Sequence, residues 1–190
     1  GVTVQMVDEE KRAWHAGLSF WNGVTDINSA SIGIEIVNGG HDYDLPDFPR
    51  AQIKAVTALS KDILSRRHIP AFNIVGHSDI APARKQDLGE KFPWAELAAC
   101  GIGYWPDGIS NDNRVLFERG AKDRGIAILQ RGLAFIGYDA RVTSELDEDT
   151  ALILTALQRR YLPAQVSGQI DVQTIEVITK LADAKKALKL

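Results

Sequence analysis

Several features that point to particular classes of protein are scarce or missing in this chain of 190 residues. It has a single cysteine, Cys100, which excludes an intramolecular disulfide, and we expect this side chain to be a small buried hydrophobic group. The most continuous apolar stretch, ALILTAL at 151–157, is too short to cross a bilayer, so no transmembrane segment is predicted. The formal net charge of −3 offers no basic surface to a nucleic acid.

The rest of the composition is typical of a globular protein, with 45% hydrophobic and 25% charged residues. No signal peptide or lipidation motif is present, and the chain begins with Gly1 rather than Met. Its first residues, VTVQMV, already have the composition of a strand. We therefore interpret the chain as processed or trimmed at this end, and the missing export signal does not indicate the cytoplasm.

The first half of the sequence alternates strand and helix patterns. SIGIEIVN at 31–38 places an isoleucine at every second position, as in a strand with one apolar face. Residues 49–69 then carry apolar side chains at helical spacing, and FNIV at 72–75 is a short apolar strand that ends at Gly76. This order predicts a βαβ unit with parallel strands and a right-handed connection.

The second half reads as helical and follows a clear boundary. GIGYWPDGISNDN at 101–113 is rich in glycine, asparagine and aspartate and has no periodicity. A helix is predicted near 121–136, ended by Gly137. Two more helical segments, 145–158 and 169–181, repeat one local pattern, in which an aspartate precedes a threonine by three positions.

We expect Asp147 and Asp171 to be the N-caps of these last two helices. We accordingly divide the chain into one domain at 1–105 and a linker with a second domain at 106–190. The second domain is expected to be a small, all-helical unit of three helices that folds separately. Its size is modest, although domains of about 75 residues do fold alone.

Chemically active side chains are concentrated in GHSDIAPARKQDLG at 76–89, directly after a predicted strand. His77 lies at the carboxyl end of that strand, where open α/β sheets bind ligands, and the loop returns a carboxylate at Asp87. Histidine and aspartate both bind zinc, and a catalytic zinc takes three protein ligands and a water. A spacing of ten residues matches no particular metal motif, so a polar residue that merely ends the strand is the alternative for His77.

Each of three further side chains has two possible roles. Glu35 is either a solvated carboxylate on the polar face of its strand, which is the commoner case, or a partly desolvated general base, since its face also carries Gly33 and Val37. Lys85 is either solvated or a donor to a developing oxyanion. His15 either packs in a turn or lines an aromatic-rimmed cleft for a sugar or peptide. No G-x-S-x-G segment is present, which disfavours a serine hydrolase.

Four segments together carry a family resemblance: RAWHAG, SIGIEIVN, GHSDIAPARKQDLG and FPWAEL. Over residues 1–105 they resemble the zinc-dependent N-acetylmuramoyl-L-alanine amidases of the type-2 family. The later stretch LQRGLAFIGYDARVTSELDEDTALILTALQRRY is similar to the three-helix peptidoglycan-binding domain often appended to cell-envelope amidases. The resemblance implies a mixed β-sheet flanked by helices, one Zn²⁺, and hydrolysis of the amide bond between N-acetylmuramic acid and L-alanine.

The resemblance also implies roles for six residues of this sequence. These are the zinc ligands His77 and Asp87, the catalytic acid/base Glu35, the stabiliser of the tetrahedral intermediate Lys85, and the substrate-binding residues His15 and Arg84. The family's first zinc ligand is a histidine upstream of RAWHAG, before the point at which this sequence starts at Gly1. The chain by itself would then carry two of the three ligands and bind zinc poorly.

We therefore expect an enzyme of the cell envelope, in the periplasm, that acts on peptidoglycan or muropeptides without an obligate protein partner. One alternative is a non-catalytic peptidoglycan-recognition protein, because relatives that lack a zinc ligand still bind muropeptides in the same groove. The presence of Glu35 and Lys85 favours the enzyme. The other alternative is a cytosolic amidase that recycles anhydro-muropeptides, which the appended domain disfavours.

Overall fold

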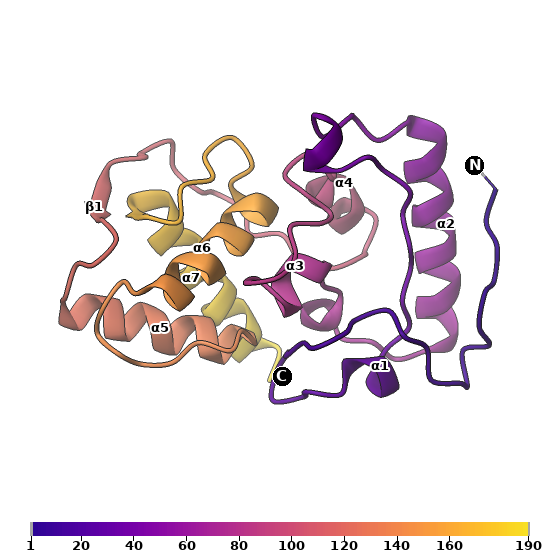
Figure 1. The fold of residues 1–190 in the computed structure, drawn as a ribbon, viewed down its shortest axis with the longest axis horizontal. Coiled ribbons are helices and arrows are strands. Elements are labelled where there is room, and N and C mark those ends of the chain that lie inside the picture. The colour runs from indigo at the N-terminus through magenta and orange to yellow at the C-terminus, as the bar shows by residue number, and fades with distance from the viewer. Residues whose placement is uncertain (1, 190) are drawn as a thin grey trace.

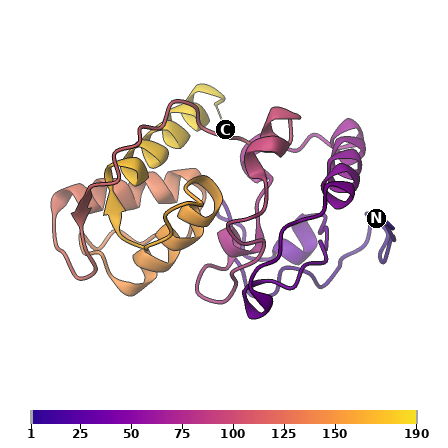
Figure 2. The same ribbon diagram turned by 90° about the horizontal axis from the view of Figure 1, so that it is seen from above.

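Two regions of different build lie next to each other in the computed structural model, which describes residues 2–189 (Figure 1). The first region contains, in chain order, α1 (Ile27–Ala30), the 3-10 turn η1 (His41–Tyr43), α2 (Arg50–Arg66), the 3-10 turn η2 (Ala71–Asn73), α3 (His77–Ile80) and α4 (Trp94–Ala99). The second contains β1 (Val115–Phe117), α5 (Arg124–Ile136), α6 (Glu148–Tyr161), β2 (Ile170–Asp171) and α7 (Val172–Ala187). Figure 2 shows the same two parts from above, with irregular chain between them.

Apart from isolated bridges, the strands found within residues 2–189 are β1 and β2, an antiparallel pair in the second region. The fold is therefore mixed α/β with a small sheet, as the class predicted from the sequence requires. The predicted placement of the sheet was wrong, since residues 2–105 contain no sheet and the second region, predicted to be all-helical, holds both strands. A strand needs a hydrogen-bonded neighbour, and residues 31–38 make no backbone–backbone hydrogen bond to any described residue. Residues 71–73 form the turn η2 instead of a strand.

The alternation predicted for residues 31–38 is nevertheless present in their burial. The isoleucines at 32, 34 and 36 are partly buried, and the residues between them are exposed. Glu35 is one of these exposed residues, so the expectation that it is partly desolvated was wrong. Ile36 packs on the small hydrophobic cluster beside α2, and the Gln52 side chain donates to the Val37 carbonyl at 2.6 Å. The segment therefore runs along α2 with its apolar face inward (Figure 1), but without a pairing strand.

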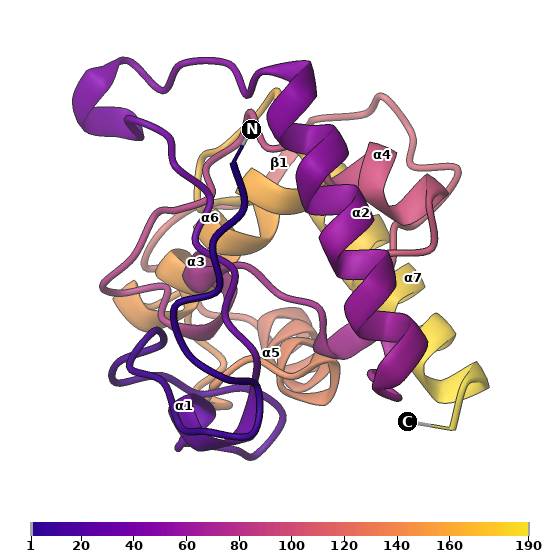
Figure 3. The same cartoon turned by 90° about the vertical axis from the view of Figure 1, so that its right-hand side faces the viewer.

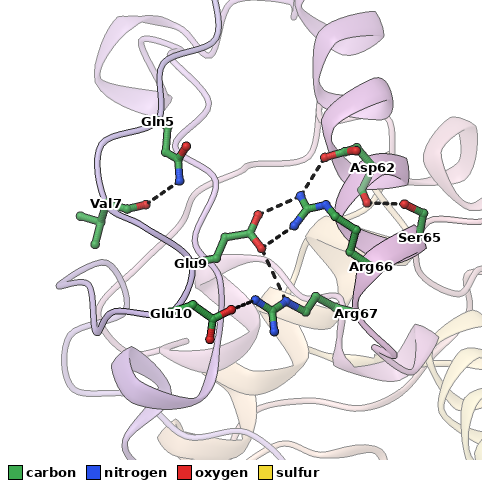
Figure 4. Close-up of polar contacts among 8 residues, drawn as sticks. All are labelled: Gln5, Val7, Glu9, Glu10, Asp62, Ser65, Arg66 and Arg67. Atoms are coloured by element: carbon green, nitrogen blue, oxygen red, sulfur yellow. Dashed lines mark hydrogen bonds and ion pairs between the residues drawn. The ribbon is translucent and has the colours of Figure 1, made fainter.

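The N-terminal segment runs down the outer side of the first region, the side that also carries α2 (Figure 3). Both carboxylate oxygens of Glu9 accept hydrogen bonds from Arg66, at 2.7 and 2.9 Å, and Glu10 pairs with Arg67 (Figure 4). Residues 2–7 form no strand, so the prediction for VTVQMV was wrong. These ion pairs connect the N-terminal segment to residues 66 and 67. Exposed ion pairs of this kind contribute little stability.

The largest hydrophobic cluster joins the two regions. It combines the inner faces of α5, α6 and α7 with Trp21, Phe72 and Ile80 of the first region. The Trp21 ring meets the edge of Tyr138 at a centroid distance of 5.0 Å. A second, smaller cluster around Val56 and Leu97 lies entirely in the first region. Most of the buried apolar surface therefore belongs to the second region and to its contact with the first.

The three helices of the second region begin at aspartate N-caps. The side chain of Asp123 accepts from Gly125 N–H, that of Asp147 from Thr150 N–H, and that of Asp171 from Thr174 N–H. The caps predicted at positions 147 and 171 are confirmed, as is Gly137 at the end of α5, where φ is 142°. Each cap satisfies a backbone donor that the first turn leaves free.

Two smaller expectations have clear outcomes. Cys100 is exposed, so the prediction of a buried side chain was wrong, because α4 ends at Ala99 and Cys100 lies beyond its buried face. Within residues 2–189, no helix combines the length and apolarity needed to cross a membrane.

Candidate functional site

A cavity of about 450 Å³ opens in the first region, between residues 31–36, α2, residues 73–77 and α4. Its lining is mainly apolar, with a few polar side chains, which is the usual composition of a small-molecule site. Four of the six site residues predicted from the sequence line it: His15, Glu35, His77 and Asp87. Arg84 and Lys85 are not part of the lining.

His77 and Asp87 meet at this cavity. The His77 Nδ1 atom lies 3.0 Å from Asp87 Oδ2. This hydrogen bond is the main cause that lowers the pKa of the Asp87 carboxyl; desolvation opposes it, and the positive charge of Lys85 adds a smaller lowering. Lys85 therefore acts electrostatically on the Asp87 carboxyl, although its side chain is not part of the cavity lining.

The local fold holds the backbone on both sides of His77. Gly76 N–H donates to the Asp79 Oδ2 atom at 2.8 Å, and Ser78 N–H donates to the Asp87 carbonyl at 2.8 Å. The single turn of α3 thus starts at His77 and is tied to the returning loop. This is why a spacing of ten residues in sequence becomes a direct contact in space.

The second ring nitrogen of His77 and the guanidinium of Arg84 contact the same backbone carbonyl. His77 Nε2 lies 3.1 Å from the Ala16 carbonyl oxygen. Arg84 Nη2 donates to that same oxygen and to the Leu18 carbonyl, both at 2.8 Å. Gly17, between them, has φ +62°, and a Cβ there would lie 3.1 Å from Arg84, so this close approach requires glycine. Arg84 thus fixes the wall beside His77.

His15 packs directly on Gly33. A Cβ at position 33 would lie 2.6 Å from the His15 ring, which explains why this position has no side chain. The ring is held at both nitrogens, 3.1 Å from the Ala13 carbonyl and 2.8 Å from Ser31 Oγ. His15 therefore has a packed structural environment and still lines the cavity beside the strand-like segment that carries Glu35.

The pair of His77 and Asp87 fits part of a zinc site. Two ligands of one tetrahedral zinc lie about 3.3 Å apart, close to the observed 3.0 Å. The second nitrogen of His77 faces a carbonyl, which is common for a metal-binding histidine. A catalytic zinc takes three protein ligands, whereas residues 2–189 contain no cluster of three or more His, Cys, Asp or Glu side chains that suits a metal. Within residues 2–189, the His77–Asp87 pair is therefore at most part of the ligand set of such a site.

Two residues next to the site were missed by sequence reasoning. Asp79 and Arg160 form a buried ion pair with an N···O distance of 2.7 Å, behind the loop that carries His77. The available signal was the position of Arg160 on α6, three residues after the fully buried Leu157 and so on the same apolar stripe. A charged residue on such a stripe needs a buried partner.

Comparison with known proteins gives one family match and several similar proteins. The family model described as N-acetylmuramoyl-L-alanine amidase matches residues 1–90. N-acetylmuramoyl-L-alanine amidase AmiD of Escherichia coli K12 is 40% identical over 185 residues, which are 94% of this chain and 66% of that protein. The 1,6-anhydro-N-acetylmuramyl-L-alanine amidase AmpD of Enterobacter cloacae is 41% identical over 99 residues, 52% of this chain and 51% of that protein.

Solved structures agree with these sequence matches. The E. coli AmiD complex with anhydro-N-acetylmuramic acid-L-Ala-D-gamma-Glu-L-Lys superposes with a TM-score of 0.81 at 36% identity, covering 95% of this chain and 72% of that one. AmpDh3 of Pseudomonas aeruginosa in complex with an anhydromuramic pentapeptide gives 0.80 at 37% identity, covering 95% and 72%. The chain thus spans just under two thirds of the full AmiD sequence and about half of AmpD.

Proposed function

Because this chain belongs to the N-acetylmuramoyl-L-alanine amidase family, we propose that it hydrolyses the amide bond between N-acetylmuramic acid and L-alanine in peptidoglycan or muropeptides. The observation that carries the proposal is the meeting of His77 and Asp87 at a cavity that Glu35 also lines. The AmiD and AmpDh3 complexes, which hold anhydromuramic peptides, support the class of substrate.

In this proposal His77 and Asp87 are two of the three protein ligands that a catalytic zinc takes, and residues 2–189 contain no cluster that includes a third. A zinc ion bound there supplies a Lewis acid for the scissile carbonyl and a water with a pKa near 7. Zinc ligands must be deprotonated, so in this proposal Asp87 would bind as the carboxylate and His77 as the neutral imidazole.

The proton transfers are assigned to Glu35. Its carboxylate takes a proton from the attacking water and returns it to the leaving amine of L-alanine. The ammonium group of Lys85 donates a hydrogen bond to the oxyanion that develops on the carbonyl oxygen. Lys85 is suited to this role because its positive charge acts on the Asp87 carboxyl and because it forms no salt bridge with another described residue.

Substrate binding is assigned to His15 and Arg84. His15 and Ala16 line the cavity, and Arg84 donates hydrogen bonds to the carbonyls of Ala16 and Leu18. Residues 106–190 are proposed to be the linker and peptidoglycan-binding part, and the site of action is proposed to be the cell envelope, in the periplasm. Binding to insoluble wall would then raise the local concentration of substrate at the cavity.

The test compares the 190-residue chain with a longer chain that includes the residues encoded before Gly1. Zinc content is measured by metal analysis, and release of peptides is followed on a soluble anhydro-muropeptide and on purified sacculi. We expect zinc and activity in the longer chain and little of either in the shorter one. A zinc-loaded longer chain that binds muropeptides without cleaving them would instead identify a recognition protein. A longer chain active on the soluble muropeptide but unable to bind sacculi would favour a recycling amidase.

Variants of the longer chain separate the two catalytic roles from metal binding. Glu35→Gln is expected to retain zinc and to lower turnover by roughly 100-fold or more, as loss of a general base does. Lys85→Ala is expected to retain zinc and the fold and to lower turnover by about 100-fold, the typical effect of losing one oxyanion donor. Glu96→Gln, on the exposed face of α4, is the matched control and should change neither quantity. Loss of zinc together with activity in either catalytic variant would make that residue a structural support.

A further inference from the structure

The buried guanidinium of Arg160, in the second region, is hydrogen-bonded to the loop that carries His77. Arg160 of α6 is 5% exposed and Asp79 of α3 is 2% exposed. Arg160 Nη1 donates to Asp79 Oδ2 at 2.7 Å, and Nη2 donates to the Ile74 carbonyl at 2.9 Å. The guanidinium therefore holds the backbone three residues before His77 and a side chain two residues after it. These two contacts leave the intervening loop little freedom to move.

Asp79 links Arg160 to the start of α3 through a second hydrogen bond. Its Oδ2 atom also accepts from Gly76 N–H at 2.8 Å, and its Oδ1 atom accepts from the Tyr138 hydroxyl at 2.8 Å. Both carboxylate oxygens are thus occupied, and two of the three donors come from the second region. Because the Asp79 rotamer is fixed in this way, Gly76 N–H is fixed as well, and Gly76 is the residue directly before His77.

Stability alone does not account for such an arrangement. A buried ion pair gains little net free energy, because desolvation of both charges offsets their attraction. Arg160 Nε is buried without a hydrogen-bond partner among the described residues, which adds a further cost. The guanidinium stacks on Trp94 at 4.0 Å and lies 5.0 Å from the Tyr161 ring centroid, which recovers part of that cost. The geometry that the pair imposes is therefore the better explanation.

We propose that Arg160 is a positioning residue that orients the His77 imidazole toward Asp87 by holding Ile74 and Asp79. The same displacement that moved His77 would also move Asp87, because Ser78 N–H is bonded to the Asp87 carbonyl. The consequence for catalysis rests on the proposed function, whereas the orientation of His77 is a property of the folded chain without metal or substrate. The second region would then be a structural part of the site.

Lys185 provides a matched control within the same chain. It is 3% exposed, comes from α7, and also joins the two regions, with its Nζ atom 2.9 Å from Asn22 Oδ1 and 3.0 Å from the Ile136 carbonyl. Neither partner lies in the loop between residues 74 and 87. Replacing Arg160 or Lys185 with methionine removes one buried cation in each case, but only the first change releases the His77 loop.

The first experiment observes His77 directly in the metal-free chain. Histidine ring signals are recorded by ¹H–¹³C NMR at one pH for the wild type, Arg160→Met and Lys185→Met, and folding is checked by circular dichroism. The protein has four histidines, and His77 is assigned by its loss in His77→Gln. We expect Arg160→Met to shift or broaden the His77 signals alone, and Lys185→Met to leave all four histidines in place. Unchanged His77 signals in folded Arg160→Met, or equal changes in both variants, would overturn the proposal.

Two further variants cover the case in which Arg160→Met does not fold. Asp79→Asn keeps the shape of the side chain and removes its charge, so it should also move the His77 signals, and a folded Asp79→Asn with wild-type signals would overturn the proposal. Arg160→Lys keeps the charge but cannot reach Asp79 and the Ile74 carbonyl as a rigid fork. It should therefore give a smaller change than Arg160→Met, and a change as large or larger would count against positioning by the fork.

The second readout is kinetic and uses the longer, zinc-loaded chain. Misplacement of a reacting group lowers turnover much more than substrate affinity, so we expect Arg160→Met to reduce kcat by roughly 10- to 100-fold with KM changed less than about twofold. Lys185→Met should leave both constants near the wild-type values, and a matching loss of kcat in that variant would overturn a specific role for Arg160. If the wild type itself lacks amidase activity, the proposed function fails, while the NMR experiment still decides whether Arg160 orients His77.

Discussion

The two regions of this protein differ in how fully the polar groups of their backbone are hydrogen-bonded. In the second region, α5, α6 and α7 begin at aspartate caps and pack around side chains such as Leu133 that are fully buried. In the first region, residues 31–38 make no backbone–backbone hydrogen bond to described residues, and a cavity of about 450 Å³ separates them from residues 73–77. The candidate site lies in the less regular first region. The well-packed second region contacts the loop that carries His77 through Arg160.

This difference matters because a reactive site needs fixed geometry as well as open space. Open space is present where the first region leaves its cavity unfilled, which is also where His77, Asp87 and Glu35 gather. Fixed geometry comes in part from α6, through the contact of Arg160 with Asp79. Loops positioned by a rigid scaffold commonly carry function, and here the scaffold belongs to a segment more than seventy residues later in the chain.

The largest effect is expected when the two regions are separated at 105/106. Residues 1–105 would lose the partners of Trp21, Phe72 and Ile80 in the main cluster and would retain Asp79 as a buried charge without its cation. Loss of one partner of a buried pair alone costs about 3–5 kcal/mol, so we expect this piece not to fold. Circular dichroism and urea unfolding of both pieces provide the measurement. Cooperative unfolding of residues 106–190 at the midpoint of the whole chain would instead support the separate three-helix unit expected from the sequence.

Sequence reasoning succeeded where the cause of a structure is local. The apolar spacing of α2 and the aspartates that cap α6 and α7 act within a few residues, and those elements form as predicted. The alternation at residues 31–38 was also correct, because it depends only on which side faces α2. Whether that segment becomes a strand depends on a partner elsewhere in the chain, which its own pattern does not specify.

The same reasoning explains what was found and missed at the site. His77 and Asp87 were identified because both lie in one short loop whose ends the sequence marks with Gly76 and Gly89. Arg160 was missed because its partner Asp79 is 81 residues away, and a single sequence gives no link between two charges at that separation. The guanidinium of Arg84 is bonded to two backbone carbonyls in the structure, and its role in substrate binding stays a prediction.

A pair of leucine variants compares packing in the two regions. Leu133 is 0% exposed in the main cluster, and Leu97 is 2% exposed in the smaller cluster and lines the cavity. Leu133→Ala should lower the free energy of unfolding by about 4 kcal/mol, near the upper part of the range for buried leucines. Leu97→Ala should cost about 2 kcal/mol, because the cavity already deprives this side chain of some contacts. Urea denaturation measures both, and equal losses would show that the first region is packed as tightly as the second.

Alkaline pH tests burial at the boundary between the regions. Burial raises the pKa of Tyr161 to about 12 and that of Tyr138 well above 10. In the unfolded chain both ionise near pH 10, so their contribution to stability is complete below pH 10 and is lost as the pH rises toward the folded-state values. We expect each to lower the free energy of unfolding by about 1.4 kcal/mol at pH 11. Absorbance at alkaline pH should show both hydroxyls protonated in the native protein at pH 11.

Single tyrosine replacements identify which side chain is responsible. Tyr161→Phe should flatten the decline in stability between pH 10 and pH 12, because one titrating group is removed from the unfolded state. Tyr43→Phe is the control, since the Tyr43 side chain is exposed (76%) and packs in neither cluster. A decline that Tyr161→Phe leaves unchanged would mean that this hydroxyl is accessible in the native protein.

The smallest effect is expected at the helix N-termini. There the two regions differ, because α6 has a side-chain cap and α2 has none. Asp147 accepts a hydrogen bond from Thr150 N–H at 2.9 Å, so Asp147→Ala leaves that donor unpaired and should lower the free energy of unfolding by about 1 kcal/mol. At α2 the N-cap position is Pro49, which makes no side-chain hydrogen bond to the helix. Pro49→Ala should therefore cost less than about 0.5 kcal/mol, because it removes no partner from the first turn. Urea unfolding of the two variants gives the comparison, and a larger loss from Pro49→Ala would show that the entry to α2 depends on a rigid backbone instead of a cap.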